Sequence, residues 1–292
     1  MKVHYYPGCS LEGTAVEYDR STRVVMAALG VELLEIEGWT CCGASAAEAT
    51  DEWLALALPA RNLALAERHP ETRDVLVPCS ACYLNLKHVE EKTRTDAQLR
   101  STINTLIEGE DLRFQGRVRV RHLLDVLASD LGPAAIHPKV VRPLDGLRIA
   151  PYYGCQCLRP YAVFDDPEMP TSMEPLIRAV GAEVFPWPMG GRCCGASHMN
   201  TQPEVGITLV AGILKAARGA DVIVTVCPMC QMNLEAFQNS VSRSQHMDLH
   251  ISVLYLPQLI GLAMGLPASD LGLGYNLALT EEWRHRVHAP AS

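Results

Sequence analysis

Short apolar runs alternate with longer segments of mixed polarity along the whole chain. In the first half, runs rich in β-branched and aromatic residues predict strands over 3–6, 31–36 and 74–77. Between these runs, apolar residues recur with the period of a helix over 12–29 and 48–67. Strands that alternate with helices in this way predict a parallel sheet with right-handed crossovers.

The second half of the chain shows the same alternation. Its expected elements are strands over 147–153, 183–185 and 221–226 and helices over 171–180 and 203–218. The most apolar stretch, 251–267, contains Pro257 and is shorter than the roughly 20 residues that span a bilayer. We therefore expect a buried strand over 251–254 followed by a helix, and no direct membrane span.

Sequence motifs recur in the same order in both halves, which indicates an internal duplication. The matching segments are 5–9 with 152–155, 41–45 with 193–197, and 74–87 with 221–235. We therefore predict an α/β fold of two homologous domains, residues 1–140 and 141–292, in a pseudo-twofold arrangement. Each domain should contain a small parallel sheet flanked by helices.

Composition and charge narrow the classes of partner. The 292 residues are 48% hydrophobic and 20% charged, which excludes a disordered chain. Asp and Glu outnumber Lys and Arg by 33 to 25, a formal net charge of -8, so no basic field is available for nucleic acid. The first residues contain no long apolar leader, and we expect a cytoplasmic protein in a reducing compartment.

The cysteines are grouped rather than scattered. Ten of the eleven form two sets of five, each with a single cysteine, an adjacent pair and a CxxC motif. The first set is Cys9, Cys41, Cys42, Cys79 and Cys82, and the second is Cys155, Cys193, Cys194, Cys227 and Cys230. Each group follows the end of a predicted strand, where the loops of a parallel sheet meet, so we expect each set to converge.

Five thiols with an adjacent pair restrict the cofactor chemistry. A structural zinc ion takes four ligands, and the fifth thiolate would be surplus. A polynuclear iron–sulfur cluster can use more thiolates, although an ordinary cubane takes four cysteines. A non-enzymatic zinc scaffold and a metal-free dithiol protein remain as alternatives.

The paired CCG motifs resemble the cysteine-rich domain that is repeated in the B subunit of heterodisulfide reductase. The segments 154–160 (GCQCLRP), 164–172 (FDDPEMPTS) and 221–235 extend the resemblance along essentially the whole chain. The resemblance implies that each set of five cysteines binds one noncubane 4Fe-4S cluster. One departure is a gap of 32 residues between the second CC pair and its CxxC, against 36 in the first. All five thiols survive this deletion, which lies in or beside the expected helix over 203–218.

The resemblance also implies a catalytic subunit that reduces a disulfide, or oxidises two thiols in reverse, between two clusters. Cleaving a disulfide takes two electrons, and two clusters can supply one each. No G-x-G-x-x-G dinucleotide motif is present, so the electrons should come from partner proteins. The implied partners are a ferredoxin-like C subunit and a flavin-containing A subunit, with a small-molecule or carrier-bound disulfide or thiol as substrate. An alternative is an electron-relay subunit of a lactate-, glycolate- or quinone-linked oxidoreductase.

Five further side chains near the cysteines could bear on the chemistry. For Lys87, Arg159, Arg192 and His198 we favour solvated charges or helix caps over catalytic roles. Cys157 has no counterpart in the first repeat, and we interpret it as a small buried thiol.

Overall fold

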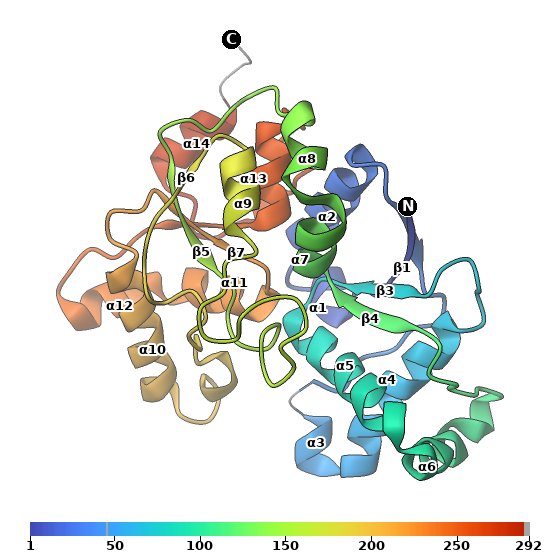
Figure 1. Ribbon diagram of the computed structural model, residues 1–292. Coiled ribbons are helices and arrows are strands. Elements are labelled where there is room, and N and C mark those ends of the chain that lie inside the picture. The colour runs from blue at the N-terminus through green and yellow to red at the C-terminus, as the bar shows by residue number, and fades with distance from the viewer. Residues whose placement is uncertain (45, 289–292) are drawn as a thin grey trace.

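The computed structural model describes residues 1–44 and 46–288 and contains two sheets of four parallel strands each (Figure 1). The first sheet has the order β2-β1-β3-β4, with β1 Lys2–Tyr5, β2 Glu32–Glu35, β3 Asp74–Val77 and β4 Arg119–His122. The second has the equivalent order β6-β5-β7-β8, with β5 Arg148–Tyr152, β6 Glu183–Val184, β7 Val222–Thr225 and β8 Ser252–Tyr255. The predicted fold class, two duplicated halves with small parallel sheets, is confirmed.

Helices connect and cover the strands. In the first half they are α1 Cys9–Glu12, α2 Val16–Ala28, α3 Ala47–Thr50, α4 Glu52–Ala66, α5 Ser80–Thr95, α6 Ala97–Ile107, α7 Leu123–Asp125 and α8 Gly132–Ile136, with short helices η1 Glu108–Glu110, η2 Val126–Leu131 and η3 His137–Lys139. In the second half they are α9 Glu174–Ala179, α10 Pro203–Ala216, α11 Pro228–Ala236, α12 Gln238–Gln245, α13 Leu256–Ala263 and α14 Glu281–His288, with η4 Ala196–His198 and η5 Leu273–Tyr275. The strand and helix expected within 251–267 are β8 and α13.

Three expected helices are shorter than their hydrophobic pattern suggested. The helix expected over 12–29 begins at Val16, because a turn separates α1 from α2. The helix expected over 48–67 is broken at Asp51, whose carboxylate caps α4 by accepting the Leu54 N–H at 2.9 Å. The helix expected over 171–180 begins at Glu174, because the Asp165 carboxylate holds the preceding amides in a loop.

Strand β4 was not expected from the hydrophobic pattern. Its sequence alternates arginine with apolar or aromatic residues, and the arginines obscure the apolar face. Arg121 is nevertheless buried, because its guanidinium pairs with Asp125 and with Asp130 at 3.1 Å. The ion pairs allow a charged side chain to lie inside an edge strand that pairs with β3.

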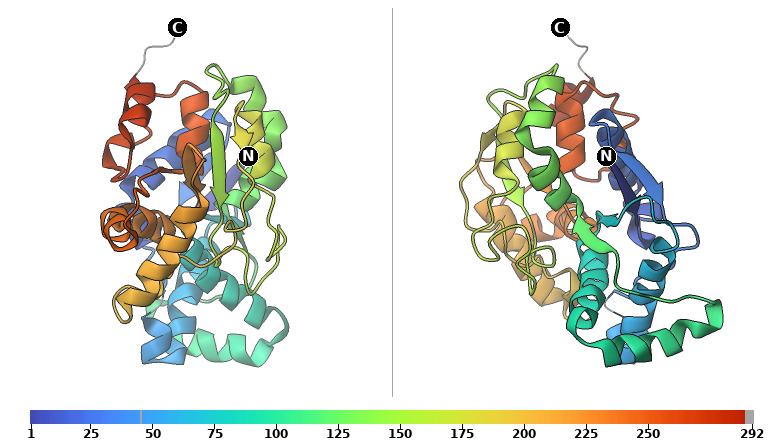
Figure 2. Two further views of the ribbon diagram at one scale, coloured as in Figure 1. Left: turned by 90° about the vertical axis from the view of Figure 1, so that its left-hand side faces the viewer. Right: turned by 45° about the vertical axis from the view of Figure 1, so that its right-hand side comes forward.

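Helices of each half pack against helices of the other half and cover its apolar surface. Helix α13 of the second half packs on α2 of the first, and α8 of the first half packs on α9 of the second. Figure 2 shows α13 standing between α2 and the green α7–α8 segment. One continuous hydrophobic core accordingly runs through both halves. The boundary between residues 140 and 141 stays a prediction.

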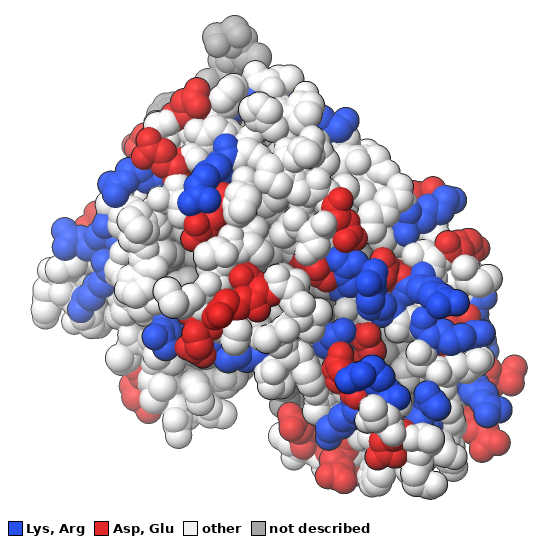
Figure 3. Space-filling model, viewed as in Figure 1, with Lys and Arg blue, Asp and Glu red and all other residues white. Residues whose placement is uncertain are grey.

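Charged side chains of both signs mingle over the lobe that contains α4, α5 and α6, whereas the seam between the halves is largely uncharged on the face in Figure 3.

Within 1–44 and 46–288, no helix has both the length and the apolar character needed to cross a bilayer.

Candidate functional site

The cysteines of the first set lie together at the carboxyl ends of β1, β2 and β3, and we call this group the N-terminal cysteine site. The Cys42 Sγ lies 3.3 Å from the Cys82 Sγ, and the Cys9 Sγ lies 4.0 Å from the Cys41 Sγ. Cys79 is the N-cap of α5 and hydrogen bonds through its thiol to Cys82. Cys42, Cys79 and Cys82 are buried, and Cys9 and Cys41 are exposed.

The second set forms the C-terminal cysteine site in the same way. The Cys194 Sγ lies 3.7 Å from the Cys230 Sγ, and the Cys155 thiol hydrogen bonds to Cys193. Cys227 is the N-cap of α11, as Cys79 is of α5. All five cysteines line one pocket of about 70 Å³. The convergence expected from the strand order is therefore present in both halves.

Glycines allow the backbone to approach the sulfurs. Gly8 and Gly154 precede the single cysteines with φ of 73° and 72°, a conformation that favours glycine. A Cβ at Gly8 would lie 2.8 Å from the Cys82 Sγ, and one at Gly154 would lie 2.9 Å from the Cys230 Sγ. Any residue other than glycine at either position would therefore place its Cβ against a cysteine sulfur.

Two amide side chains hold the CC pairs in place. Asn85 donates to the Cys42 carbonyl at 3.1 Å, and its counterpart Asn233 donates to the Cys194 carbonyl at 2.7 Å. Each asparagine lies three residues after the CxxC motif, on the helix that the motif begins. This role was not predicted from the motifs, although the recurrence of asparagine in both repeats was a signal for it.

Two buried tyrosines act on the other side of the CC pairs. The Tyr6 hydroxyl donates to the Thr40 carbonyl at 2.6 Å, and the Tyr152 hydroxyl donates to the Arg192 carbonyl at 2.7 Å. These carbonyls belong to the residues immediately before the pairs. In both halves, therefore, a tyrosine hydroxyl binds the carbonyl before the CC pair and an asparagine amide binds the carbonyl of its second cysteine.

The sulfurs also receive backbone hydrogen bonds. The Gly43 N–H donates to the Cys41 Sγ at 3.4 Å, and the Gly195 N–H donates to the Cys193 Sγ at 3.3 Å. Such donors favour the thiolate over the thiol. The repeated contact prepares the exposed first cysteine of each pair for binding as an anion.

Contacts between thiols shift their pKa values in opposite directions. The hydrogen bond from Cys155 lowers the pKa of the Cys193 thiol to about 5, although burial opposes this shift. Burial and the neighbouring Cys41 raise the pKa of the Cys9 thiol to about 11. Part of each set is therefore easily deprotonated, whereas the remaining protons leave readily only when a metal displaces them.

The seam between the halves brings the two CxxC loops together. The hydroxyl of Tyr18, on α2, lies 3.2 Å from the Pro78 carbonyl oxygen and 3.1 Å from the Val226 carbonyl oxygen. These residues immediately precede Cys79 and Cys227. The Tyr18 ring stacks on Tyr255 with centroids 4.0 Å apart. One buried side chain thus links both cysteine sites, a contact that the repeat pattern gives no means of finding.

The charged candidates near the cysteines have mainly structural contacts. Arg159 donates to the carbonyls of Pro167 and Gly191, both at 2.5 Å, and so braces a loop. Lys87 was expected to be solvated, but it is only 4% exposed and pairs with Glu90 at 3.0 Å. That expectation was wrong, because the ion pair compensates the burial of the ammonium group.

The remaining candidates divide into exposed and buried side chains. Arg192 and His198 are exposed, as solvated charges would be. Cys157 is buried as expected, and its thiol donates to the Tyr153 carbonyl at 3.2 Å.

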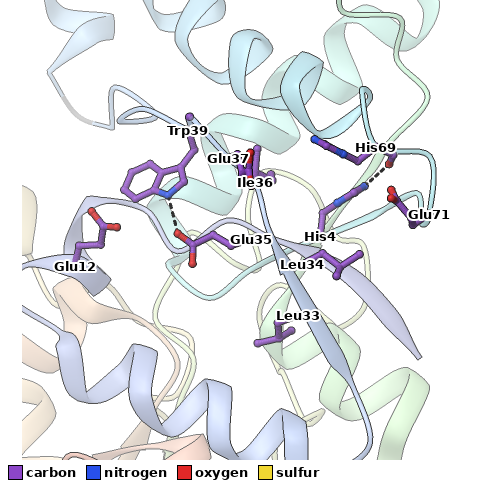
Figure 4. A pocket seen from close by; sticks show the side chains of 11 residues that line it. His4, Glu12, Leu33, Leu34, Glu35, Ile36, Glu37, Trp39, His69 and Glu71 are labelled. Atoms are coloured by element: carbon purple, nitrogen blue, oxygen red, sulfur yellow. Dashed lines mark hydrogen bonds between the residues drawn. The ribbon is translucent and has the colours of Figure 1, made fainter.

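A larger open pocket of about 840 Å³ lies along the edge strand β2, and no cysteine lines it (Figure 4). Two of its polar side chains are engaged with neighbouring groups. Trp39 donates to Glu35 at 3.3 Å, and the Nε2 of His4 lies 2.8 Å from the His69 carbonyl oxygen. The two sets of five cysteines therefore lie apart from this pocket. In the described part of the chain, no group of three or more His, Cys, Asp or Glu side chains, the two sets of cysteines included, is arranged to hold a single metal ion.

Comparison with known proteins places both halves in one family. The model of the cysteine-rich CCG domain matches residues 3–87 and 149–235. The 8-methylmenaquinol:fumarate reductase membrane anchor subunit of Wolinella succinogenes is 37% identical, with 94% of this chain and 95% of that protein covered. The B subunit of the ferredoxin/F(420)H(2)-dependent CoB-CoM heterodisulfide reductase of Methanosarcina acetivorans is 28% identical, with 98% and 97% covered. A protein of Archaeoglobus profundus that is named as similar to the B subunit of heterodisulfide reductase is 30% identical, with 91% of each chain covered.

A solved structure supports the fold. The crystal structure of a hypothetical protein from Helicobacter pylori matches 96% of this chain with a TM-score of 0.77 at 14% identity, and this chain spans 52% of that one. Both halves match the domain, and the similarity to the curated relatives runs along nearly the whole chain. The chain therefore belongs to the family of CCG cysteine-rich domain proteins that includes the B subunit of heterodisulfide reductase.

Proposed function

We propose that this chain is the catalytic iron–sulfur subunit of a heterodisulfide reductase-like complex. Each cysteine site holds one noncubane 4Fe-4S cluster, and the pair exchanges two electrons with a disulfide or with two thiols. The observation that carries this proposal is the matched pair of five-cysteine sites, joined at the seam by the Tyr18 hydroxyl. Family membership supports an iron–sulfur cofactor, and the paired arrangement supports two-electron chemistry.

The residues present fit such a cofactor. Each site offers five thiols, and Gly8 and Gly154 keep other side chains away from the sulfurs. The N–H groups of Gly43 and Gly195 add donors that favour bound thiolate. A set of five soft sulfur ligands suits an iron–sulfur core better than a single zinc ion, which four ligands satisfy.

The reaction balances when both sites contribute. A disulfide plus two electrons and two protons gives two thiols, so the sulfur–sulfur bond breaks as each sulfur receives one electron and one proton. The clusters would supply the electrons singly, one from each site. The chain's own residues position the two sites: Asn85 and Asn233 fix the CC pairs, and Tyr18 fixes the CxxC loops against each other.

The names of the relatives support a complex of several subunits. Two relatives are named as subunits of heterodisulfide reductases that depend on ferredoxin or F(420)H(2). By analogy, a ferredoxin-like C subunit and a flavin-containing A subunit would deliver electrons to this chain. Both are expected to co-purify with it under anaerobic conditions.

Anaerobic purification and metal analysis test the cofactor. We expect about eight irons and about eight acid-labile sulfides per chain, the count for two four-iron clusters. A colourless protein with zinc and no sulfide would contradict the proposal. The reduced protein is then mixed with the CoB-CoM heterodisulfide or with oxidised lipoamide, with reduced methyl viologen as the electron source. We expect dye oxidation with release of two thiols per two electrons.

A second candidate function is supported by one comparison. The relative at 37% identity is named as a subunit of a quinol-linked fumarate reductase, so this chain could relay electrons between a quinone pool and a partner enzyme. A chain with both clusters that reduces neither disulfide, but passes electrons between a menaquinol analogue and a co-purified dehydrogenase, would establish the relay function instead.

A further inference from the structure

The two sheets have four edge strands, β2, β4, β6 and β8. In a parallel pair, alternate residues of an edge strand turn their N–H and carbonyl toward the neighbouring strand, and the residues between them turn these groups outward. Outward groups that nothing covers are a template for a further strand. The four edges differ in how these groups are satisfied.

Three of the edges are covered or very short. On β4, the outward N–H of Val120 donates to the Glu90 carboxylate at 2.9 Å. On β8, two amide side chains donate to the outward carbonyl of Val253 at 2.9 and 3.0 Å. Strand β6 has two residues, of which only Val184 turns its backbone outward. None of these three edges offers a run of open backbone groups.

Strand β2 is the open edge. The N–H of Glu32 donates to the Met1 carbonyl at 2.9 Å, so Glu32 turns its backbone toward β1. By alternation, Leu33 and Glu35 turn theirs outward. Within residues 1–44 and 46–288, the N–H and carbonyl groups of Leu33 and Glu35 have no hydrogen-bond partner. The edge therefore presents two donors and two acceptors to whatever lies beside it.

The space beside β2 is the open pocket of about 840 Å³. Both Leu33 and Glu35 line this pocket, and so does Leu34 between them. The side chains of Leu33 and Leu34 are half-buried, so each keeps apolar surface that a neighbouring strand would cover. The hollow therefore lies where a fifth strand of the first sheet would run.

The charge of the pocket indicates what kind of segment fits it. Its lining includes four glutamates and neither lysine nor arginine; the glutamates are Glu12, Glu35, Glu37 and Glu71. Figure 4 shows Glu12 to one side of β2 and Glu71 to the other. Glu35 already pairs with Arg23 at 2.5 Å, whereas the other three have no ion pair in the part of the chain that the structure describes. Basic side chains on either face of an added strand would meet a carboxylate. A second copy of this chain would instead place like charges together, which is unfavourable.

We infer that the β2 edge is a docking site for an extended, basic segment of a partner protein, which adds a fifth strand to the first sheet through the outward groups of Leu33 and Glu35. Backbone hydrogen bonds provide the affinity in this mode of binding, and the side-chain surroundings provide the selectivity. No cysteine lines the pocket, so the inference does not depend on the proposed function.

A synthetic peptide tests the docking site on the full chain as purified. The probe is the amide-capped peptide KVRVKVR, and hydrogen exchange read by mass spectrometry locates its binding. We expect a dissociation constant below about 1 mM. Exchange should slow at residues 32–37, and the acidic peptide EVEVEVE should not bind. Raising the salt concentration from about 0.05 to about 0.5 M should weaken the basic peptide, because screening reduces the attraction of the carboxylates.

Two variants test the backbone and the charge separately. Leu33→Pro removes an outward N–H but leaves the pairing with β1, and it should weaken the peptide about tenfold. Val184→Pro is the matched control, because it removes the outward N–H of β6 and should leave the affinity unchanged. Glu71→Lys should also weaken the basic peptide, whereas Glu108→Lys, at an exposed position that does not line the pocket, should change it less.

Three results would overturn the inference: no binding of KVRVKVR, slowed exchange outside 32–37 only, or equal affinities of the wild type and Leu33→Pro. A chain that sediments as a dimer and becomes monomeric in Leu33→Pro would also overturn it, because the edge would then be occupied by a second copy. The proposed function is judged by iron, sulfide and disulfide reduction, and none of these peptide results bears on it.

Discussion

The N-terminal and C-terminal cysteine sites are two versions of one design. Both have a glycine before the single cysteine, a tyrosine two residues before that glycine, and an asparagine after the CxxC motif. They differ in the linking segment, where α3 of the first half is replaced by the short turn η4 of the second. That segment is one residue shorter in the second half, α10 is one residue shorter than α4, and the turn after α10 is two residues shorter, which together give the gap of 32 residues against 36. These residues beside the sulfurs are therefore the same in both halves, and the differences lie in the segments that link the cysteines.

The largest expected effect comes from removing one ligand from each site in turn. Cys42→Ser should lower the iron content from about eight to about four per chain, and Cys194→Ser should do the same. Iron and sulfide analysis of both variants measures this, with Cys157→Ser as the control that retains the full content. Complete loss of iron in either single variant would show that the two sites load as one rather than independently.

A pH difference between the halves follows from the ends of the fourth strands. That position is His122 in the first half and Tyr255 in the second. Burial lowers the pKa of His122 from 6.5 to about 4, so the unfolded chain takes up a proton below about pH 6.5 while the folded chain does not. The free energy of unfolding should therefore fall by about 3 kcal/mol between pH 6.5 and 4.

Urea unfolding across this range, compared with His122→Asn, measures that dependence. Asparagine can still cap the following helix but does not titrate. The wild type should lose more stability than the variant as the pH falls. Parallel pH curves for the two proteins would show that the buried histidine is not the cause.

Glycine positions also affect the stability of the chain. Gly154→Ala should destabilise the chain by about 1–2 kcal/mol through its positive φ, and further because the new Cβ would lie 2.9 Å from the Cys230 Sγ. Gly146→Ala is the matched control, since Gly146 has a φ of 76° and nothing within 4 Å of the added carbon. Thermal unfolding of the apoprotein and iron content separate the two causes, because only Gly154→Ala should also reduce iron binding.

The Tyr18 hydroxyl serves both halves at once. Tyr18→Phe keeps the stack on Tyr255 but leaves two buried carbonyls without this donor, and should cost about 1–3 kcal/mol. The buried Tyr83 hydroxyl has no hydrogen-bond partner among the described residues, so Tyr83→Phe should be close to neutral. Chemical unfolding of the two variants compares their losses in free energy of unfolding. Equal losses would mean that removing any buried tyrosine hydroxyl, rather than the hydrogen bonds at the seam, is the cause.

The smallest expected difference lies between the two asparagines. Asn233 is buried and its hydrogen bond is shorter, so Asn233→Ala should cost about 1 kcal/mol, whereas the partly exposed Asn85 should cost less in Asn85→Ala. Unfolding of both variants under the same conditions gives the ranking. Equal losses would mean that the two CC pairs depend on their amide donors to the same extent.

The sequence predicted those features of the structure that depend on a pattern within one half of the chain. Alternating strands and helices predicted the parallel sheets, and the position of each cysteine after a strand predicted which thiols meet. Strand β4 was missed because two of its four residues are arginines, and the sequence does not show that Arg121 is buried in ion pairs. Residue 45 of the first CCGAS motif lies outside the described residues.

Contacts between the halves could not be predicted in this way. Tyr18 and Ser80 of the first half contact the Val226 carbonyl of the second half, and the pattern within either half marks neither contact. Periodicity reports which side of an element is apolar but not which distant element covers it. The ligand role of the ten cysteines itself stays a prediction, which the metal analysis tests.

The reciprocal packing of α13 on α2 and of α8 on α9 has a consequence for folding. A half expressed alone would expose the apolar surface that its sister normally covers, and it would need a complementing fragment to become native. Heat or denaturant should therefore melt the molecule in a single cooperative transition. A substitution that destabilises one repeat should therefore also destabilise the cysteine site of the other.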